Sequence, residues 1–144
     1  ETSPLVRRAY AESLSRMRGE QRNQILGVLL GFADDHANPD LPLLLWHQAL
    51  QAGIEPLRLT QLAAEGDSAL FQRFTARLVA ENMSHGPQPV SDLLDLAKKP
   101  GLLANVVAGM ADGLRGLRKV AKPEGWNRFA ANAHATLDSA GAAR

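Results

Sequence analysis

The sequence predicts an all-α protein: a HEAT-like stack of about eight helices that forms one helical-repeat domain over residues 1–144. Three observations lead to this fold class. β-Branched residues are scarce, and no alternating apolar pattern lasts long enough for a strand. Apolar residues instead recur at helical spacing between capping residues, prolines and glycines. A short sequence pattern also returns along the chain at intervals typical of helix pairs.

Two helices are predicted before the acidic stretch that begins at residue 34. Ser3 can cap the first, and Pro4 suits its first turn because an N–H there would have no helical partner. This helix ends near Gly19, and its inward stripe comprises Leu5, Val6, Ala9, Leu14 and Met17. The inward residues of the second helix are Ile25, Leu26, Leu29, Phe32 and Ala33.

A third and a fourth helix follow the acidic stretch. Asp40 is expected to cap the third by accepting hydrogen bonds from its first backbone N–H groups, and Pro42 occupies the first turn. Gly53 is a natural left-handed residue for its end. The inward residues of this helix are expected to be Leu43, Leu44, Trp46, Ala49 and Leu50. The fourth helix begins at Pro56 and closes at Gly66.

The second half of the chain predicts four more helices and one marked interruption. Asp67 or Ser68 caps a helix that continues through Val79. Residues 84–91, "SHGPQPVS", contain two prolines and a glycine, so this segment is the candidate hinge. Beyond it we expect a short helix around 93–96, a longer one over about 102–114, and a last one over about 124–137 in which Trp126 buries its ring.

Four of these helices share a short pattern. "SPLVRRAYAESL" at 3–14 aligns with "SALFQRFTARLV" at 68–79, and weaker echoes occur at 42–49 and 102–109. Each carries a leucine in second place and a small residue in eighth place, which neighbouring helices need in order to approach closely. The eighth-place residues are Ala11, Ala49, Ala76 and Gly109. A chain rich in leucine and alanine could also produce so short a pattern by chance.

The stretch "ADDHANPD" at 33–40 allows two interpretations. Its oxygen and imidazole ligands Asp34, Asp35, His36, Asn38 and Asp40, together with His47, could bind a metal ion and form a small metal-dependent hydrolase. However, the spacing is not that of an EF-hand, and no second histidine lies at a chelating interval on the same helix. Asp and Asn also form turns, and acids gather before helix N-termini. We therefore favour a structural corner between two helices, with no metal and no catalytic residue.

Basic residues recur at matching places in the repeats and again near the C-terminal end. They could form an interaction surface for an acidic partner, or they could lie across a helix face and pair with neighbours such as Glu12 and Glu81. The candidate surface residues are Arg7, Arg8, Arg73, Arg77, Arg115, Arg118 and Lys119. We expect structural roles for Asp40, Pro42, Trp46 and Trp126.

Composition excludes several classes of function. The chain has no cysteine, so disulfides, thiolate metal sites and the Cys-x-x-Cys-His attachment of c-type haem are excluded within it. Its apolar runs are far shorter than the roughly 20 residues of a membrane span, so no membrane insertion is expected. A net charge of +1 and only seven aromatic residues argue against nucleic-acid binding. Because the sequence starts "ETSPLVRR", without methionine, we expect a segment of a longer protein.

Three stretches resemble one family. They are "SPLVRRAYAESLSRMRGEQRNQIL", the acidic corner with its tryptophan-bearing helix in "DDHANPDLPLLLWHQAL", and "VVAGMADGLRGLRKVAKPEGW". Together they are similar to the helical-repeat region of very large secreted bacterial proteins, described as membrane-bound dehydrogenases or haem-binding proteins. The resemblance covers about residues 3–127. Residues Gln48 and Ala49 depart from it, because a more aromatic or acidic stretch is usual there.

In that family, a sugar-dehydrogenase-like β-propeller precedes the helical repeats and a cytochrome c domain follows them. The resemblance therefore implies a non-catalytic scaffold that mediates contact between domains, or with a protein partner, inside an extracytoplasmic redox protein. It implies no cofactor in this segment, since the haem motif would lie outside it. The periplasmic or secreted location is likewise implied by the resemblance alone.

Overall fold

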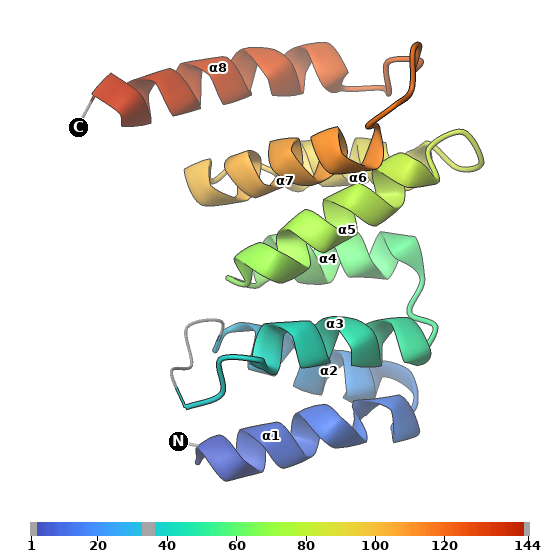
Figure 1. Cartoon of the computed structure of the whole chain (residues 1–144), viewed down its shortest axis with the longest axis vertical. Coiled ribbons are helices and arrows are strands. Elements are labelled where there is room, and N and C mark those ends of the chain that lie inside the picture. Colours follow the sequence, from blue (N-terminus) through green and yellow to red (C-terminus); the bar gives the residue numbers. More distant parts are fainter. Residues whose placement is uncertain (1–2, 33–36, 143–144) are drawn as a thin grey trace.

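The computed structural model describes residues 3–32 and 37–142, and within them the chain is all-α (Figure 1). Eight α-helices and one short 3-10 turn occur in these residues, and no strand does. The predicted all-α class and the number of helices are thereby confirmed. The helices are α1 (Pro4–Ser13), the 3-10 turn (Leu14–Arg16), α2 (Gly19–Leu30), α3 (Leu41–Gln51), α4 (Pro56–Glu65), α5 (Ala69–Glu81), α6 (Gln88–Leu96), α7 (Pro100–Gly113) and α8 (Trp126–Ala142).

Local signals in the sequence account for several helix ends. The Ser3 hydroxyl accepts a hydrogen bond from the Val6 N–H at 3.3 Å, and Ser68 accepts one from the Phe71 N–H at 3.2 Å. Each bond satisfies a backbone donor that the first helical turn leaves unpaired. Gly53 follows α3 with φ of 65°, a left-handed conformation that glycine adopts without steric cost. The candidate hinge at 84–91 includes the start of α6, which begins at Gln88.

The helices form two layers that run along the long axis of the molecule (Figure 1). In one layer α1, α3, α5 and α7 each pack against the next helix of the series. In the other, α2 packs against α4 and α4 against α6. Helix α8 packs against both α6 and α7, so it covers the end of the molecule opposite to α1 and α2.

The buried apolar residues form two clusters that meet at α5. The N-terminal core extends from Ala11 to Phe71 and includes Trp46, whose ring lies edge-on to Phe71 at a centroid distance of 5.4 Å. The C-terminal core extends from Ala76 to Ala133. Because Phe71 and Ala76 both belong to α5, this helix connects the two cores.

Helices α5 and α7 make the most extensive contact between any two helices, and glycine makes their close approach possible. A Cβ added at Gly109 would lie 2.7 Å from the Cβ of Ala76 and closer still to the carbonyl oxygen of Arg73. A Cβ added at Gly113 would lie 2.6 Å from the carbonyl oxygen of Arg77. The two glycines are one helical turn apart and lie on the same side of α7. No side chain therefore separates the backbones of α5 and α7 at these two positions.

A buried amide connects α4, α5 and α7. Gln72 donates from Nε2 to the carbonyl oxygens of Ala63 and Gly66 at 3.2 and 2.9 Å, and its Oε1 accepts a hydrogen bond from the Asn105 side chain at 2.8 Å. The first two bonds satisfy carbonyl groups at the end of α4 that have no helical partner. Gln72 was absent from the predicted core because its polar head gives no apolar signal.

The inward faces of α1 and α3 differ from the prediction. The small eighth-place residues Ala11, Ala49 and Ala76 are buried, whereas the second-place Leu5 is 81% exposed and Leu43 is also exposed. Other residues that were wrongly expected inside are Val6, Ala9 and Leu50. Helix α3 instead buries Leu41, Leu45, Trp46 and Ala49, whose spacing places them on one side of the helix.

Trp126 begins α8 and is partly buried against the C-terminal core, with its ring 5.7 Å from that of Phe129. Trp126→Ala is expected to lower the free energy of unfolding by about 1 to 2 kcal/mol, because a partly buried ring forfeits only part of the energy of a core side chain. Urea unfolding followed by circular dichroism measures this effect. Phe129→Ala, at a fully packed position, should cost clearly more, and the reverse order would show that Trp126 is the main anchor of α8.

Candidate interaction surface

The described part of the acidic corner has structural contacts. Asn38 is buried and donates from its side-chain amide to the carbonyl oxygen of Pro4 at 3.1 Å. Both carboxylate oxygens of Asp40 accept a hydrogen bond from Nη1 of Arg8 at 3.1 Å. These contacts join the start of α1 to the start of α3, while Asp34, Asp35 and His36 lie outside the described residues.

The predicted helix cap at Asp40 is wrong. Asp40 does occupy the capping position of α3, but its carboxylate accepts no hydrogen bond from the helix. Its backbone has φ of −89° and ψ of −1°, whereas a capping side chain needs an extended backbone to reach the first N–H groups. The carboxylate therefore pairs with Arg8, and Pro42 occupies the second position of the helix.

No set of three or more histidine, aspartate or glutamate side chains lies within reach of one metal ion in residues 3–32 and 37–142. His47 is exposed on α3, on a different side of the helix from the buried Trp46. Over the same residues, no helix is both long and apolar enough to cross a bilayer.

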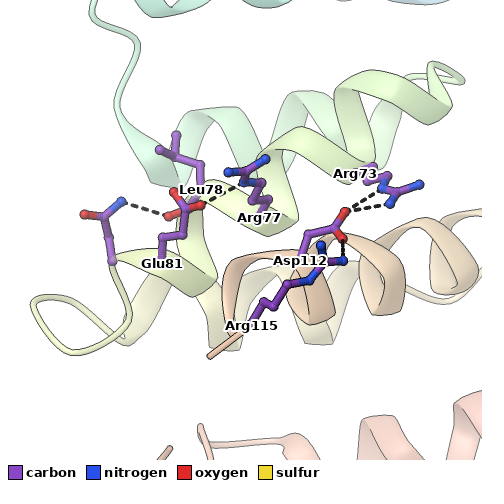
Figure 2. A network of polar contacts seen from close by, with 7 residues as sticks. Arg73, Arg77, Leu78, Glu81, Asp112 and Arg115 are labelled. Atoms are coloured by element: carbon purple, nitrogen blue, oxygen red, sulfur yellow. Dashed lines mark hydrogen bonds and ion pairs between the residues drawn. The ribbon is translucent and has the colours of Figure 1, made fainter. Parts of the chain in front are cut away.

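Figure 2 shows a cluster of charged side chains where α5 crosses α7, which we call the arginine cluster. Arg73 donates from Nε and Nη2 to one carboxylate oxygen of Asp112 at 2.8 and 2.6 Å. Arg115 donates to the other oxygen at 3.0 Å. One turn along α5, Arg77 donates to Glu81 at 2.8 Å. Three arginines thus surround two carboxylates, and the cluster retains an excess of positive charge.

The arginine cluster favours the ionised form of Asp112. The hydrogen bond from Arg73 lowers the pKa of Asp112, and the charges of Arg73, Arg115 and Arg77 lower it further. The hydrogen bond and charge of Glu81 likewise raise the pKa of Arg77. Asp112 and Arg73 belong to different helices, so their ion pair joins α7 to α5 in addition to the contacts at Gly109 and Gly113.

Asp112→Asn is expected to destabilise the protein at neutral pH and to lose this effect in acid. A carboxylate whose pKa is lowered by folding stabilises the fold above its unfolded-state pKa of about 3.9, and this contribution disappears as the pH falls through the folded-state pKa. Urea midpoints of both proteins, measured from neutral pH to about pH 2, should converge at the acid end. In an Arg73→Gln background the neutral-pH difference should shrink. A difference independent of pH would show that the ion pair contributes nothing.

The seven candidate surface residues fall into two separate groups. Arg7 and Arg8 lie on α1, where the guanidinium of Arg7 is 4.6 Å from the centre of the Phe32 ring. The second group lies on α5 and after α7, toward the other end of the layers, and comprises Arg73, Arg77, Arg115, Arg118 and Lys119. The pairs Arg8–Glu12 and Arg77–Glu81 have the intrahelical geometry expected if arginines pair with neighbours.

A hollow of about 470 Å³ lies beside the second group, between the end of α5 and the segment that joins α7 to α8. Leu117, Val120, Lys119 and Lys122 line it from the joining segment, and Met83 lines it from the α5 side. The sequence prediction did not identify this hollow. The signal was present, since exposed apolar residues are interleaved with basic ones in "LRKVAK".

An exposed apolar surface lies at the opposite end of the molecule, which we call the α1–α2 face. It includes a hollow of about 330 Å³ lined by Tyr10, Val28 and Phe32, among others. Val28 is 65% exposed, and Tyr10 is exposed as well. Such clustering of exposed apolar residues is typical of a surface that another protein segment covers.

No family model, curated protein or solved structure matches this chain.

Proposed function

We propose that this domain is a non-catalytic helical-repeat scaffold that mediates contact between domains of a larger extracytoplasmic redox protein. The observation that carries the proposal is the two-layer order of helices ending in the exposed α1–α2 face. The redox context is supported by the sequence resemblance to the repeat regions of dehydrogenase and cytochrome c proteins. In this proposal the domain itself holds no cofactor.

The helix contacts support a HEAT-like repeat. In such proteins each repeat packs only on its neighbours, and helices of one layer contact the next helix of the same layer. Contacts along α1, α3, α5 and α7 and along α2, α4 and α6 follow this rule. The small residues that recur in eighth place are buried in these helices, as close packing between repeats requires.

The two ends of the molecule differ, which supports a role in contact between domains. Terminal repeats of soluble repeat proteins carry a polar outer face. Helix α8 exposes polar residues such as Asn127, Arg128 and Asp138, whereas the α1–α2 face exposes Tyr10 and Val28. We propose that another domain of the same polypeptide covers the α1–α2 face, with Arg7 at the edge of the contact.

Hydrogen exchange tests the repeat arrangement. In a nearest-neighbour stack, Phe129→Ala should increase exchange in α6, α7 and α8 while α1 to α3 keep their protection. Equal loss of protection in every helix would show one cooperative globule and contradict the repeat proposal.

Site-specific cross-linking in the whole protein, purified from its own cells, tests the scaffold role. A photo-crosslinking amino acid in place of Val28 should capture another domain of the same polypeptide. The same amino acid in place of Leu50, which is exposed on α3 outside this face, is the matched control. Capture at neither position, or equal capture at both, would contradict the proposed contact. Metal-dependent turnover of a hydrolase substrate by the isolated domain would contradict its non-catalytic character.

A further inference from the structure

We infer that the hollow between the end of α5 and the segment 117–123 binds an extended, acidic peptide segment of a partner protein. This site lies apart from the α1–α2 face and does not depend on the function proposed for that face. Three features of the structure support it: unpaired backbone, an apolar lining and a basic rim.

The backbone of residues 118–122 has no hydrogen-bond partner within the described part of the chain. The Leu117 N–H bonds to the carbonyl oxygen of Leu114, and the next bond along the backbone is from the Trp126 N–H to the carbonyl oxygen of Pro123. Between them the chain runs without helix or hydrogen-bonded turn. Residues 118–122 form no strand, but their exposed N–H and C=O groups can bond to the backbone of an incoming peptide, as the free groups at a sheet edge do.

The lining offers places for apolar side chains. Leu117 and Val120 are exposed and border the hollow, and the nearly buried Met83 borders it from the side of α5. Isolated exposed leucines and valines are ordinary, but here they line the same concave surface. The volume of about 470 Å³ is large enough for a few side chains of a peptide.

The basic side chains around the hollow favour an acidic partner. Lys119 and Lys122 both line the hollow, and Arg118 is exposed between Leu117 and Lys119. The acid that lines it, Glu81, already accepts a hydrogen bond from Arg77 at 2.8 Å, so its charge is compensated. Complementary charge therefore favours carboxylates on the peptide beside its apolar side chains.

Nucleic acid and membrane surfaces fit these features less well. The hollow has no aromatic lining on which bases could stack. A bilayer surface would use the basic charge, but it would offer the backbone N–H and C=O groups of 118–122 no complementary peptide backbone. Backbone pairing is therefore the feature that distinguishes a peptide from the other anionic partners.

The test uses a fluorescent hexapeptide of alternating glutamate and valine, titrated into the intact domain and followed by anisotropy. A lysine–valine peptide of the same length should not bind. An acidic peptide with N-methyl groups on alternate amides should bind at least about tenfold more weakly, because it cannot donate all of its backbone hydrogen bonds. Amide chemical shifts should change at residues 117–123.

Charge reversal provides the matched control. Lys119→Glu with Lys122→Glu should weaken binding of the acidic peptide by at least about tenfold. Lys98→Glu with Lys99→Glu makes the same change in net charge at exposed positions outside this hollow and should leave binding unchanged. Equal loss with both variants, no loss on N-methylation, or no binding of the acidic peptide would overturn the inference. Binding to phosphatidylserine vesicles that depends on Lys119 and Lys122 would assign the site to a membrane and overturn it equally.

Discussion

Gly109→Ala is expected to destabilise the protein by about 3 kcal/mol or more, although alanine is intrinsically the better helix former by about 1 kcal/mol. The added methyl would lie 2.7 Å from the Cβ of Ala76 and closer still to the backbone of Arg73. A backbone carbonyl cannot rotate aside as a side chain does. The clash can be removed only if α5 and α7 move apart. That movement would open the contact between the buried residues of these two helices in the C-terminal core. Urea unfolding monitored by circular dichroism measures the loss.

Gly27→Ala is the matched control, because Gly27 also lies within a helix. A Cβ there would meet the side chain of Leu62 at 3.7 Å, which is ordinary van der Waals contact. This substitution should be neutral or should stabilise by up to about 1 kcal/mol. If Gly109→Ala behaved in the same way, α5 and α7 would not be in the close contact described.

Trp46→Ala is expected to cost about 3 to 5 kcal/mol, since it removes a large aromatic side chain from the N-terminal core. Trp46 is only 7% exposed, and its ring lies edge-on to Phe71 at 5.4 Å and to Phe74 at 5.6 Å. Aromatic pairs of this geometry contribute about 0.5 to 1.5 kcal/mol beyond their burial. Both partners belong to α5, so the substitution should also loosen the contact between α3 and α5.

Leu50→Ala provides the comparison on the same helix. Leu50 is 43% exposed, and its replacement should change the free energy of unfolding by less than about 1 kcal/mol. The isolated domain with each substitution can be unfolded thermally and in urea. Similar midpoints for the two variants would mean that Trp46 does not anchor α3 to α5.

Local chemistry let the sequence alone determine the helices. The serine caps at Ser3 and Ser68 and the left-handed glycine at Gly53 act through groups within a few residues of one another. Such signals are readable because they require no knowledge of distant neighbours. Proline in the first turn gave correct starts for α1 and α4, whereas α8 begins at Trp126, two residues later than predicted.

The sequence could not determine which side of each helix faces the interior at the N-terminal end of the molecule. A periodic stripe shows that a face is apolar, but Leu5 remains exposed because no described helix covers that side of α1. The Asp40 cap failed for a related reason. Its carboxylate had a local partner in the helix N–H groups and a distant one in Arg8, 32 residues earlier, and the tertiary fold brought Arg8 within 3.1 Å.

The arginine cluster and the hollow beside Lys119 depend on the tertiary structure and could not be predicted from the sequence. Arg73 and Asp112 are 39 residues apart, and they meet because Ala76 and Gly109 let α5 and α7 approach closely. The hollow beside Lys119 likewise exists only because the end of α5 stands opposite the segment after α7. Helix formation depends on neighbours in sequence. Pairing of charges and enclosure of a hollow depend on the distances between helices, which are set by packing across the whole domain.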